Sequence, residues 1–167
     1  MPISLRRVKA SDILKLQNAN LHCLAENYPL WYWMLHYFSC PQVSHISINK
    51  NGKCLGYVLG KMDTDARSEP PHGQITSVAT FSQFRKLGIA TKLMKYTHKS
   101  LRDNFNAEYV NLHMRETNRA AAALYRGTLG YQFVKCEKSY YSDGENAYSL
   151  RYFYPGVIST VKKKEKK

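Results

Sequence analysis

The sequence of 167 residues has no long apolar run, and this absence excludes one class of protein. A helix that crosses a bilayer needs roughly 18 or more consecutive apolar residues, and no segment approaches that length. The first residues, MPISLRRVKASD, also lack the apolar core and the small-residue cleavage site of a signal peptide. We therefore expect no membrane association and a cytoplasmic or nuclear location.

The sequence lacks any cysteine motif, and it also lacks the usual glycine-rich nucleotide motifs. The four cysteines, Cys23, Cys40, Cys54 and Cys136, show no CxxC spacing, which favours reduced thiols over a zinc site or a disulfide framework. There is no GxxxxGK[ST] P-loop, and no GxGxxG follows a predicted strand. The sequence thus predicts no metal, and any phosphate group must be bound by another motif.

Acidic residues are few, at 12 against 25 lysines and arginines, which gives a net charge of +13. The last six residues, KKKEKK, carry five lysines and one glutamate, so they supply +4 of this excess and the rest lies on the body. Such a balance favours contact with nucleic acid, a ribosome, an anionic surface or a polyphosphate cofactor, although solvated surface lysines would explain it too.

The chain is long enough for one domain with a real core and too short for two ordinary ones. Its 44% hydrophobic and 22% charged residues are typical of a globular protein. The sequence contains no internal repeat and no linker. We expect one α/β or α+β domain over residues 1–153, followed by a basic, flexible tail over residues 154–167.

Strand and helix signals alternate along the chain. The expected strands are 3–8, 44–49, 53–62, 74–81, 109–114, 131–135 and 147–153, and the expected helices begin near residues 12, 29, 89 and 118. Ser11 or Asp12 should cap the first helix. Its buried face should be Ile13, Leu16, Leu21 and Leu24. The third helix has one apolar stripe at steps of four: Ile89, Leu93, Thr97, Leu101 and Phe105. Gly127 or Gly130 should end the fourth helix.

The stretch QFRKLGIATKLMKY, residues 83–96, places two cationic side chains and a glycine directly ahead of a helix. N–H groups at a helix N-terminus carry partial positive charge, and Gly88 would let a phosphate approach the backbone closely. Arg85 and Lys86 add full charges beside it. By itself this pattern fits a pyrophosphate site, and it also fits a glycine turn with two solvated bases.

Longer strings give this turn a family context. ITSVATFSQFRKLGIATKLM, YVNLHM, TNRAAAALYRGTLGY and KSYYSDGENAYSL resemble the GCN5-related N-acetyltransferase (GNAT) superfamily, in which a Q/R-x-x-G-x-G/A motif binds the pyrophosphate of acetyl-CoA. NLHCLAENYPLWYWMLHYFSCPQVSHI, GYVLGKM and PHGQITSVA resemble, more narrowly, the catalytic subunits of N-terminal acetyltransferase A (NatA) complexes. The resemblance covers about residues 3–153 and implies a mixed central sheet with splayed strands and flanking helices.

The resemblance assigns acetyl-CoA to particular residues. The acetyl carbonyl should bond to a backbone N–H on the strand at Val78, Ala79 and Thr80. Asn118 and Tyr125 should contact the cofactor from the fourth helix, although a plain helix cap would also explain Asn118. The expected pyrophosphate contacts are Arg85, Lys86, Leu87, Gly88, Ile89, Ala90 and Thr91.

An α-amine acceptor needs less help from such an enzyme than a lysine does. An N-terminal amine, with a pKa near 8, loses its proton at pH 7 for about 1 kcal/mol, whereas a lysine needs about 4.6 kcal/mol. A modest base therefore suffices for an α-amine, and the positioning of that amine matters more.

The resemblance gives three catalytic candidates. Glu26, in LAENY, matches a glutamate that NatA enzymes direct into the active site as a base or as a holder of the amine; without the resemblance it would be an exposed helix-end carboxylate. His113 matches a histidine base of a related enzyme, but the assisting tyrosine there is Gln74 here, so a satisfied core histidine is an equal alternative. Tyr125 matches the acid that protonates the departing thiolate, although its ring could also pack in the core.

The resemblance also implies a peptide entry, lined by Leu24, Glu26, Tyr28, Tyr140 and Tyr141. Tyrosine hydroxyls there can bond the backbone of the substrate, although packing alone would also explain an aromatic cluster. Tyr140 and Tyr141 cannot be equally exposed if they follow each other on one strand.

Substrates and partners follow from the same resemblance. The family acts on nascent chains that begin with Ser, Ala, Thr, Gly, Val or Cys after removal of Met, and its small pocket forms when a large helical-repeat (TPR-type) auxiliary subunit docks on the first helices. The aromatic segment PLWYWMLHYF is the candidate interface, and the basic surface and tail would serve at the ribosome. Ala25 replaces a proline of the family, and Cys40 replaces a tryptophan, which affects substrate preference and partner geometry.

Two rival interpretations stay open. The chain could acetylate acidic N-termini or lysine side chains when it is free of its partner. It could instead be a basic protein that binds RNA or the ribosome without catalysis, through its fold or through the lysine tail alone.

Overall fold

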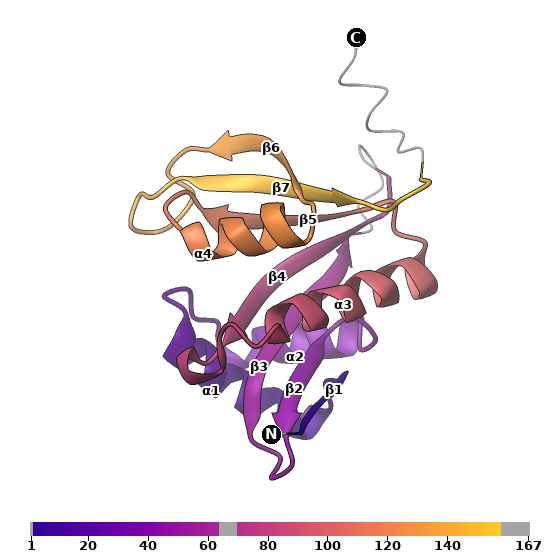
Figure 1. Ribbon diagram of the computed structural model, residues 1–167, viewed down its shortest axis with the longest axis vertical. Coiled ribbons are helices and arrows are strands. Elements are labelled where there is room, and N and C mark those ends of the chain that lie inside the picture. The colour runs from indigo at the N-terminus through magenta and orange to yellow at the C-terminus, as the bar shows by residue number, and fades with distance from the viewer. Residues whose placement is uncertain (1, 64–69, 158–167) are drawn as a thin grey trace. The chain divides into compact units, whose positions relative to one another are not determined.

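The computed structural model describes residues 2–63 and 70–157, and their contacts divide into two compact units (Figure 1). The first unit combines residues 1–61 with 76–104, and the second combines 62–75 with 105–167. The expectation of a flexible tail lies outside the described residues from position 158 onward. Strand β4, His72–Thr80, contributes its first part to the second unit and its last part to the first.

Seven strands form one mixed sheet in the order β1-β2-β3-β4-β5-β7-β6. Its strands are β1 Ile3–Arg7, β2 His45–Asn49, β3 Cys54–Asp63, β4 His72–Thr80, β5 Tyr109–Arg115, β6 Gln132–Glu137 and β7 Ala147–Phe153. The pairs β1–β2, β2–β3, β5–β7 and β6–β7 are antiparallel, whereas β4 and β5 run parallel from His72 opposite Tyr109 to Ile75 opposite Leu112. The predicted strands and the mixed sheet are confirmed.

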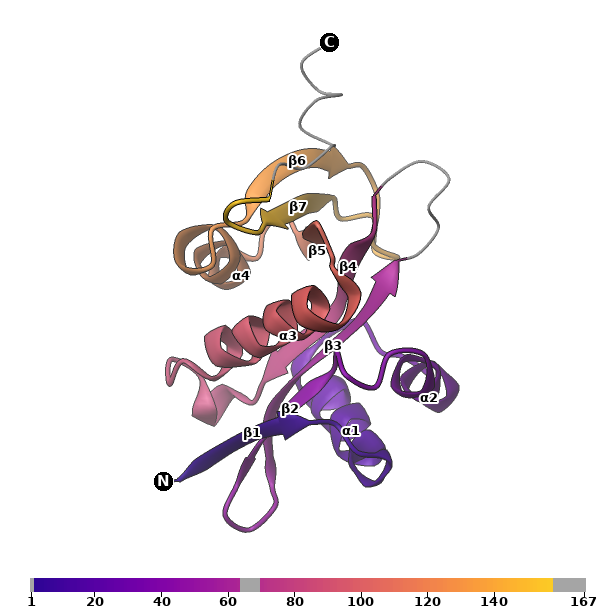
Figure 2. The same ribbon diagram turned by 90° about the vertical axis from the view of Figure 1, so that its right-hand side faces the viewer.

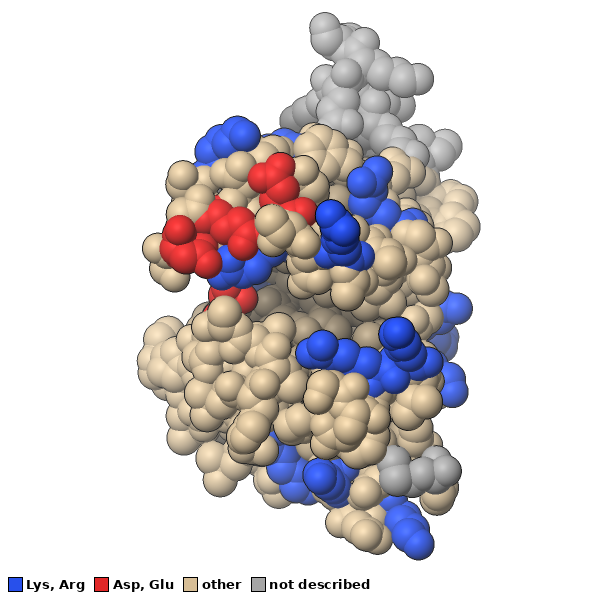
Figure 3. Space-filling model, turned by 60° about the vertical axis from the view of Figure 1, so that its left-hand side comes forward, with Lys and Arg blue, Asp and Glu red and all other residues tan. Residues whose placement is uncertain are grey.

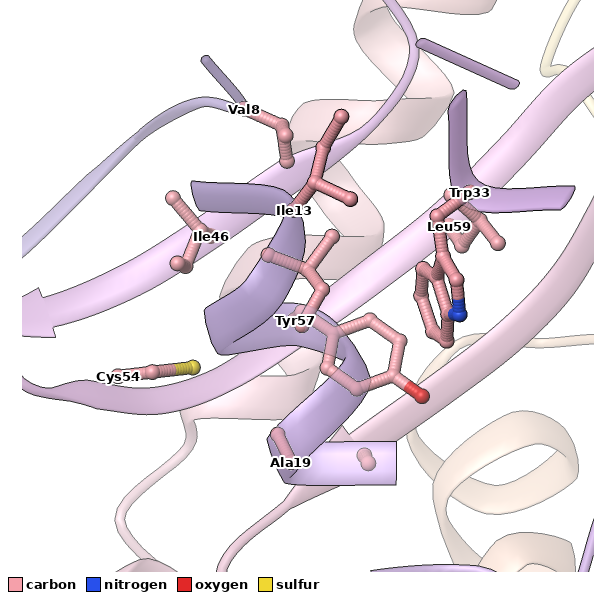
Figure 4. Close-up of a cluster of buried hydrophobic side chains, with 10 residues drawn as sticks. Val8, Ile13, Ala19, Trp33, Ile46, Cys54, Tyr57 and Leu59 are labelled. Atoms are coloured by element: carbon pink, nitrogen blue, oxygen red, sulfur yellow. The ribbon is translucent and has the colours of Figure 1, made fainter. Parts of the chain in front are cut away.

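The first unit packs helices on both faces of its strands. Helices α1 (Ile13–Cys23) and α2 (Leu30–Ser39) cover one face of β2 and β3, and α3 (Ile89–Phe105) covers the opposite face (Figure 2). The core under α1 and α2 includes Trp33 and Tyr57, whose rings meet edge to face at 5.4 Å (Figure 4). On the other face, the Thr97 hydroxyl of α3 lies 3.0 Å from His45 Nδ1.

The predicted buried face of α1 was partly wrong. Ile13 and Leu16 are buried and Leu24 is half-buried, but Leu21 is 58% exposed and Asn20 takes the inward position. At about 100° per residue, Asn20 lies about 40° around the helix from Leu16, whereas Leu21 lies about 140° away. The stripe predicted for α3 is correct, since all its members are buried except Phe105, which is half-buried.

The second unit holds α4, the shortest α-helix among the described residues, and the winding changes after it. After α4 (Arg119–Ala122) the chain continues as a π-helical segment, Ala123–Thr128. Gly130, with φ of +76°, follows the end of this segment, so of the two predicted stops it is Gly130 that acts. The segment lies along one face of β5 and β7 (Figure 1), where Tyr131 packs 5.7 Å from Tyr152.

No helix within residues 2–63 and 70–157 combines the length and the apolar character that crossing a bilayer requires.

Candidate active site

The basic glycine turn stands directly before α3, as the sequence predicted. A short 3-10 helix, Ser82–Phe84, follows β4. Arg85 comes directly after this helix, and its Nε donates a hydrogen bond to the Thr80 carbonyl at 3.2 Å. This bond joins the turn to the end of β4. The Arg85 and Lys86 side chains are both exposed to solvent.

The backbone of this turn is suited to an anion. Lys86 and Gly88 have φ angles of +62° and +72°, in the left-handed region, and such turns direct successive N–H groups into a concavity. The first helical bond runs from the Lys92 N–H to the Gly88 carbonyl at 3.0 Å, so the preceding N–H groups, those of residues 89–91, have no acceptor within the helix. No atom lies within 4 Å of where a Cβ of Gly88 would be, so the approach is open. The turn therefore fits a pyrophosphate.

The end of β4 is held closely against β3. A Cβ at Gly56 of β3 would lie 2.7 Å from the Ala79 carbonyl oxygen and 2.9 Å from Thr80 Oγ1, which is closer than side-chain carbons come. The Phe81 N–H also bonds to the Leu55 carbonyl at 3.1 Å. Glycine at position 56 therefore permits the close packing of β3 on Ala79 and Thr80, two of the three predicted β4 residues.

The connection between α1 and α2 carries the predicted substrate residues of the first unit. Buried Asn20 donates a hydrogen bond from Nδ2 to the Glu26 carbonyl at 2.9 Å, and Trp33 Nε1 donates to the Tyr28 carbonyl at 3.2 Å. The Tyr28 hydroxyl lies 3.5 Å from the Thr76 carbonyl of β4. Leu24 and Tyr28 pack on the core cluster that contains Ala79. Leu24, Glu26 and Tyr28 thus lie in the same unit as the carboxyl end of β4.

Sequence reasoning missed two side-chain pairs beneath β4. His36 Nε2 of α2 is 2.9 Å from Thr76 Oγ1, and the Tyr57 hydroxyl is 2.7 Å from Ser77 Oγ. Burial lowers the pKa of His36 and raises that of Tyr57, so both side chains are neutral at pH 7. His36 follows Trp33 by three residues, a helical spacing that places the two side chains on one face, and this spacing could have indicated that His36 points inward.

In the second unit, His113 of β5 lies against a tyrosine. Its ring is nearly parallel to that of Tyr140, with centroids 4.7 Å apart and an interplanar angle of 14°. Burial lowers the pKa of His113, and the nearby Glu137 carboxylate opposes that shift only in part. A neutral imidazole can accept a proton, so the geometry keeps His113 as a candidate base. Gln74, which stands where the related enzyme has the assisting tyrosine, accepts a hydrogen bond from Asn111 Nδ2 at 3.0 Å.

Tyr125 lies in the π-helical segment and is only 9% exposed. Burial raises the pKa of its phenol to about 12, so the hydroxyl keeps its proton at neutral pH. Its backbone carbonyl accepts the Tyr131 N–H at 2.9 Å, and the two rings are 5.7 Å apart. Single π turns inside helices frequently occur at functional sites.

Asn118 caps α4, since its Oδ1 accepts the Ala121 N–H at 3.0 Å. The cap interpretation is confirmed, and the contact with the cofactor stays a prediction.

Tyr140 and Tyr141 lie in the loop between β6 and β7 rather than on a strand, with their rings 5.1 Å apart at 80°. Tyr140 is 51% exposed and Tyr141 is half-buried, so their exposures differ, although the two residues do not lie on one strand as that expectation assumed.

The predicted site residues divide between the two units. The first unit holds Leu24, Glu26, Tyr28, Val78, Ala79, Thr80 and residues 85–91, and the second holds His113, Asn118, Tyr125, Tyr140 and Tyr141. β4 is the strand that belongs to both. Within the described part of the chain, no three His, Cys, Asp or Glu side chains gather as they would around a metal ion.

Known proteins match this sequence and fold. The model of the "Acetyltransferase (GNAT) family" matches residues 11–131. The chain is 45% identical over 149 residues to "N-alpha-acetyltransferase daf-31" of Caenorhabditis elegans, covering 89% of this chain and 81% of that protein. It is also 45% identical to "N-terminal acetyltransferase A complex catalytic subunit NAA10" of Arabidopsis thaliana, covering 89% and 77% of the two chains.

Among solved structures, "The NatB Acetyltransferase Complex Bound To CoA and MES" includes a chain that superposes with a TM-score of 0.78 at 26% identity, covering 91% of this chain and 99% of that one. The matched residues 11–131 include the glycine turn, His113 and Tyr125. The chain therefore belongs to the GNAT acetyltransferases and, within them, to the family of N-alpha-acetyltransferase catalytic subunits.

Proposed function

We propose that the chain is the catalytic subunit of a NatA-type complex, which transfers the acetyl group of acetyl-CoA to the α-amine of nascent chains that begin with Ser, Ala, Thr, Gly, Val or Cys. The observation that carries the proposal is the 45% identity with two N-alpha-acetyltransferases over 89% of the chain. The glycine turn before α3 supports the donor half independently, because its backbone suits a pyrophosphate.

The residues of the turn and of β4 would hold acetyl-CoA. When bound, acetyl-CoA supplies an acetyl group activated as a thioester. Arg85, Lys86 and the N–H groups that begin α3 offer the positive charge that its phosphates need. We assign the acetyl carbonyl to a backbone N–H within Val78–Thr80, and the close contact of Gly56 with Ala79 and Thr80 supports a fixed position for this end of β4.

Three of the predicted side chains are assigned to the proton transfers. Glu26 and His113 are the alternative bases for the amine; the low pKa of His113 leaves its ring neutral and able to accept a proton. Tyr125, whose pKa is about 12, holds a proton on Oη that a departing thiolate requires. Since an α-amine loses its proton at pH 7 for only about 1 kcal/mol, neither base has to be strong.

An exposed apolar surface on α1 and α2 supports the proposal that an auxiliary subunit binds this chain. The surface consists of Leu14, Leu21, Leu30, Trp31, Met34, Leu35 and Phe38, and each of these side chains is at least 41% exposed. Between Lys15 and Lys50 the only charged residue is Glu26. Figure 3 shows a broad part of the first unit without charged side chains. So large an apolar surface favours a permanent protein partner, and we propose a helical-repeat (TPR-type) subunit.

We further propose that the complex works in the cytoplasm at the ribosome, with a nuclear pool as well. The net charge of +13 supports this location, because ribosomal RNA attracts basic proteins. Co-sedimentation with ribosomes that weakens steeply as salt is raised would support the proposal. Sedimentation that does not respond to salt would contradict it.

Peptide competition tests the acceptor. Peptides that start with Ser or Ala, peptides that start with Asp or Glu, and peptides with a blocked N-terminus and an internal lysine are offered together, with and without the co-purified partner. We expect the complex to prefer Ser and Ala starts by at least tenfold. Preference for the internal lysine under both conditions would contradict the proposal, and a lack of acetyl-CoA binding by calorimetry would favour the non-catalytic alternative.

A further inference from the structure

The loop of residues 138–146 between β6 and β7 carries Tyr140 and Tyr141. It joins Glu137 to Ala147, which are paired across the hairpin, and with its nine residues it exceeds the usual loop of about two to five. Inside the loop, the Tyr141 N–H bonds to the Glu145 carbonyl at 3.1 Å and the Gly144 N–H bonds to the Tyr141 carbonyl at 2.9 Å. These two bonds make a tight turn, but they do not attach it to the sheet.

Arg115, the last residue of β5, makes that attachment. Its Nη1 lies 2.8 Å from Asp143 Oδ2 and 2.5 Å from Glu145 Oε2, and its guanidinium carbon lies 4.2 Å from the centre of the Tyr141 ring. The Arg115 side chain is 19% exposed. One side chain therefore contacts both acidic residues of the loop and one of its two tyrosines.

The Glu145 carboxylate is fully engaged. While Oε2 faces Arg115, Oε1 accepts the Thr117 N–H at 3.0 Å and the Thr117 hydroxyl at 2.6 Å. These hydrogen bonds from Thr117, and then the one from Arg115, lower the pKa of Glu145. Figure 3 shows acidic side chains gathered over this loop beside a basic one. The ion pairs consequently persist well below neutral pH.

The two ends of the loop are held by a separate set of bonds. Glu116 accepts hydrogen bonds from Asn146 Nδ2 at 2.9 Å and from the Tyr148 hydroxyl at 2.6 Å, and Asn146 Oδ1 accepts the Ser139 N–H at 3.0 Å. These contacts, like the bonds from Thr117 to Glu145, do not involve Arg115. Loss of Arg115 would therefore leave the hairpin in place and remove the ion pair with Asp143 and the contact with the Tyr141 ring.

The middle of the loop is where the aromatic contact with His113 lies. His113 and Arg115 are two residues apart on β5 and so share one face of the strand. Tyr141 lies against Arg115, and Tyr140 beside it stacks on His113. We propose that Arg115 is a positioning residue: by holding Asp143, Glu145 and Tyr141, it fixes the loop so that Tyr140 covers His113 and both tyrosines stand ready for the peptide.

The first test needs no activity. In proton NMR spectra of the full chain, the stacked Tyr140 ring should shield the carbon-bound imidazole protons of His113. The signals of these protons are assigned by their loss in His113→Gln, and Tyr140→Leu gives their positions without the shielding ring. We expect Arg115→Met to move these signals more than half of the way to their Tyr140→Leu positions. Lys138→Gln, which removes a positive charge from the same loop, should leave them at the wild-type positions.

If Arg115→Met fails to fold, the double variant Asp143→Asn/Glu145→Gln removes the same ion pairs from the loop side and should give the same shift. If the variant that folds keeps its His113 signals at the wild-type positions, this result overturns the positioning role of Arg115.

The second test rests on the proposed function. Arg115→Met should raise the KM for a Ser-starting peptide about tenfold and leave the KM for acetyl-CoA within about twofold, while Lys138→Gln should change neither. A peptide KM equal to that of the wild type would overturn the role of Arg115 in catalysis. Shifted His113 signals in a chain that acetylates no peptide would support the positioning role and count against the proposed function.

Discussion

At the scale of single residues, Arg85 links the end of β4 to the anion-binding turn. Its Nε is bonded to the Thr80 carbonyl, and its guanidinium stands in solvent beside the start of α3. Arg85→Ala removes a charge-assisted contact worth about 1.5–3 kcal/mol, so we expect the KM for acetyl-CoA to rise by about tenfold or more. Lys92→Ala, one turn along α3, is the matched control. An unchanged KM in Arg85→Ala would remove Arg85 from the cofactor site.

Glu26 can be tested without disturbing the backbone around it. Buried Asn20 binds the main-chain carbonyl of Glu26, and a glutamine at this position keeps that carbonyl. Glu26→Gln should therefore fold normally, bind acetyl-CoA with nearly wild-type affinity by calorimetry, and turn over Ser-starting peptides at least tenfold more slowly in the complex. Equal turnover would leave His113 as the remaining candidate base.

At the scale of elements, the contact between β3 and β4 depends on one glycine. A methyl group at position 56 would press on the Ala79 carbonyl, so we expect Gly56→Ala to lower the free energy of unfolding by about 1–3 kcal/mol and to raise the KM for acetyl-CoA. Urea unfolding measures the first effect. Gly127→Ala, where a Cβ meets nothing within 4 Å, should show no loss; an equal loss in both variants would refute the close-contact explanation.

The exposed side of α2 should decide whether the partner is retained. Phe38 is 70% exposed on that helix, and Tyr96 is 52% exposed on α3. We expect Phe38→Glu to abolish co-purification of the auxiliary subunit, because it places a charge in an apolar interface, and Tyr96→Glu to leave co-purification unchanged. Retention of the partner by Phe38→Glu would move the interface away from α2.

Local patterns predicted the elements well, because alternation and four-residue steps report directly on burial. The strands, the stripe on α3 and the glycine turn follow from such patterns, and the family resemblance supplied the candidate roles of Glu26 and Tyr125. Contacts distant in sequence were not predictable: the His36–Thr76 pair spans 40 residues, and Arg115 meets Glu145 across 30. The prediction for Leu21 was wrong for a different reason: its apolar side chain was assumed to be buried, but it is exposed.

At the scale of the whole molecule, buried histidines should set its acid sensitivity. Burial lowers the pKa of His45 and of His98 to about 4, whereas the same side chains titrate near 6.5 when unfolded. The unfolded chain therefore takes up more protons below pH 6.5, and stability that is complete above that value declines as the pH falls toward about 4. Each histidine contributes up to about 3 kcal/mol to this decline.

Urea unfolding at pH 7.5 and pH 5.0 measures that loss. His98→Leu removes one of the two groups, so the difference in unfolding free energy between the two pH values should be smaller in this variant than in the wild type. The same difference in both proteins would show that His98 does not contribute.

The π-helical segment has a consequence for how the gene can vary in length. Residues 123–128 are wound with i→i+5 bonds, which enclose one residue more than the i→i+4 bonds of an α-helix, and the segment begins at the last of the four alanines at 120–123. Loss of a single alanine codon should let this stretch rewind as a regular α-helix that still ends at Gly130. Elsewhere in this unit, a one-codon deletion in a strand would turn every following side chain to the opposite face.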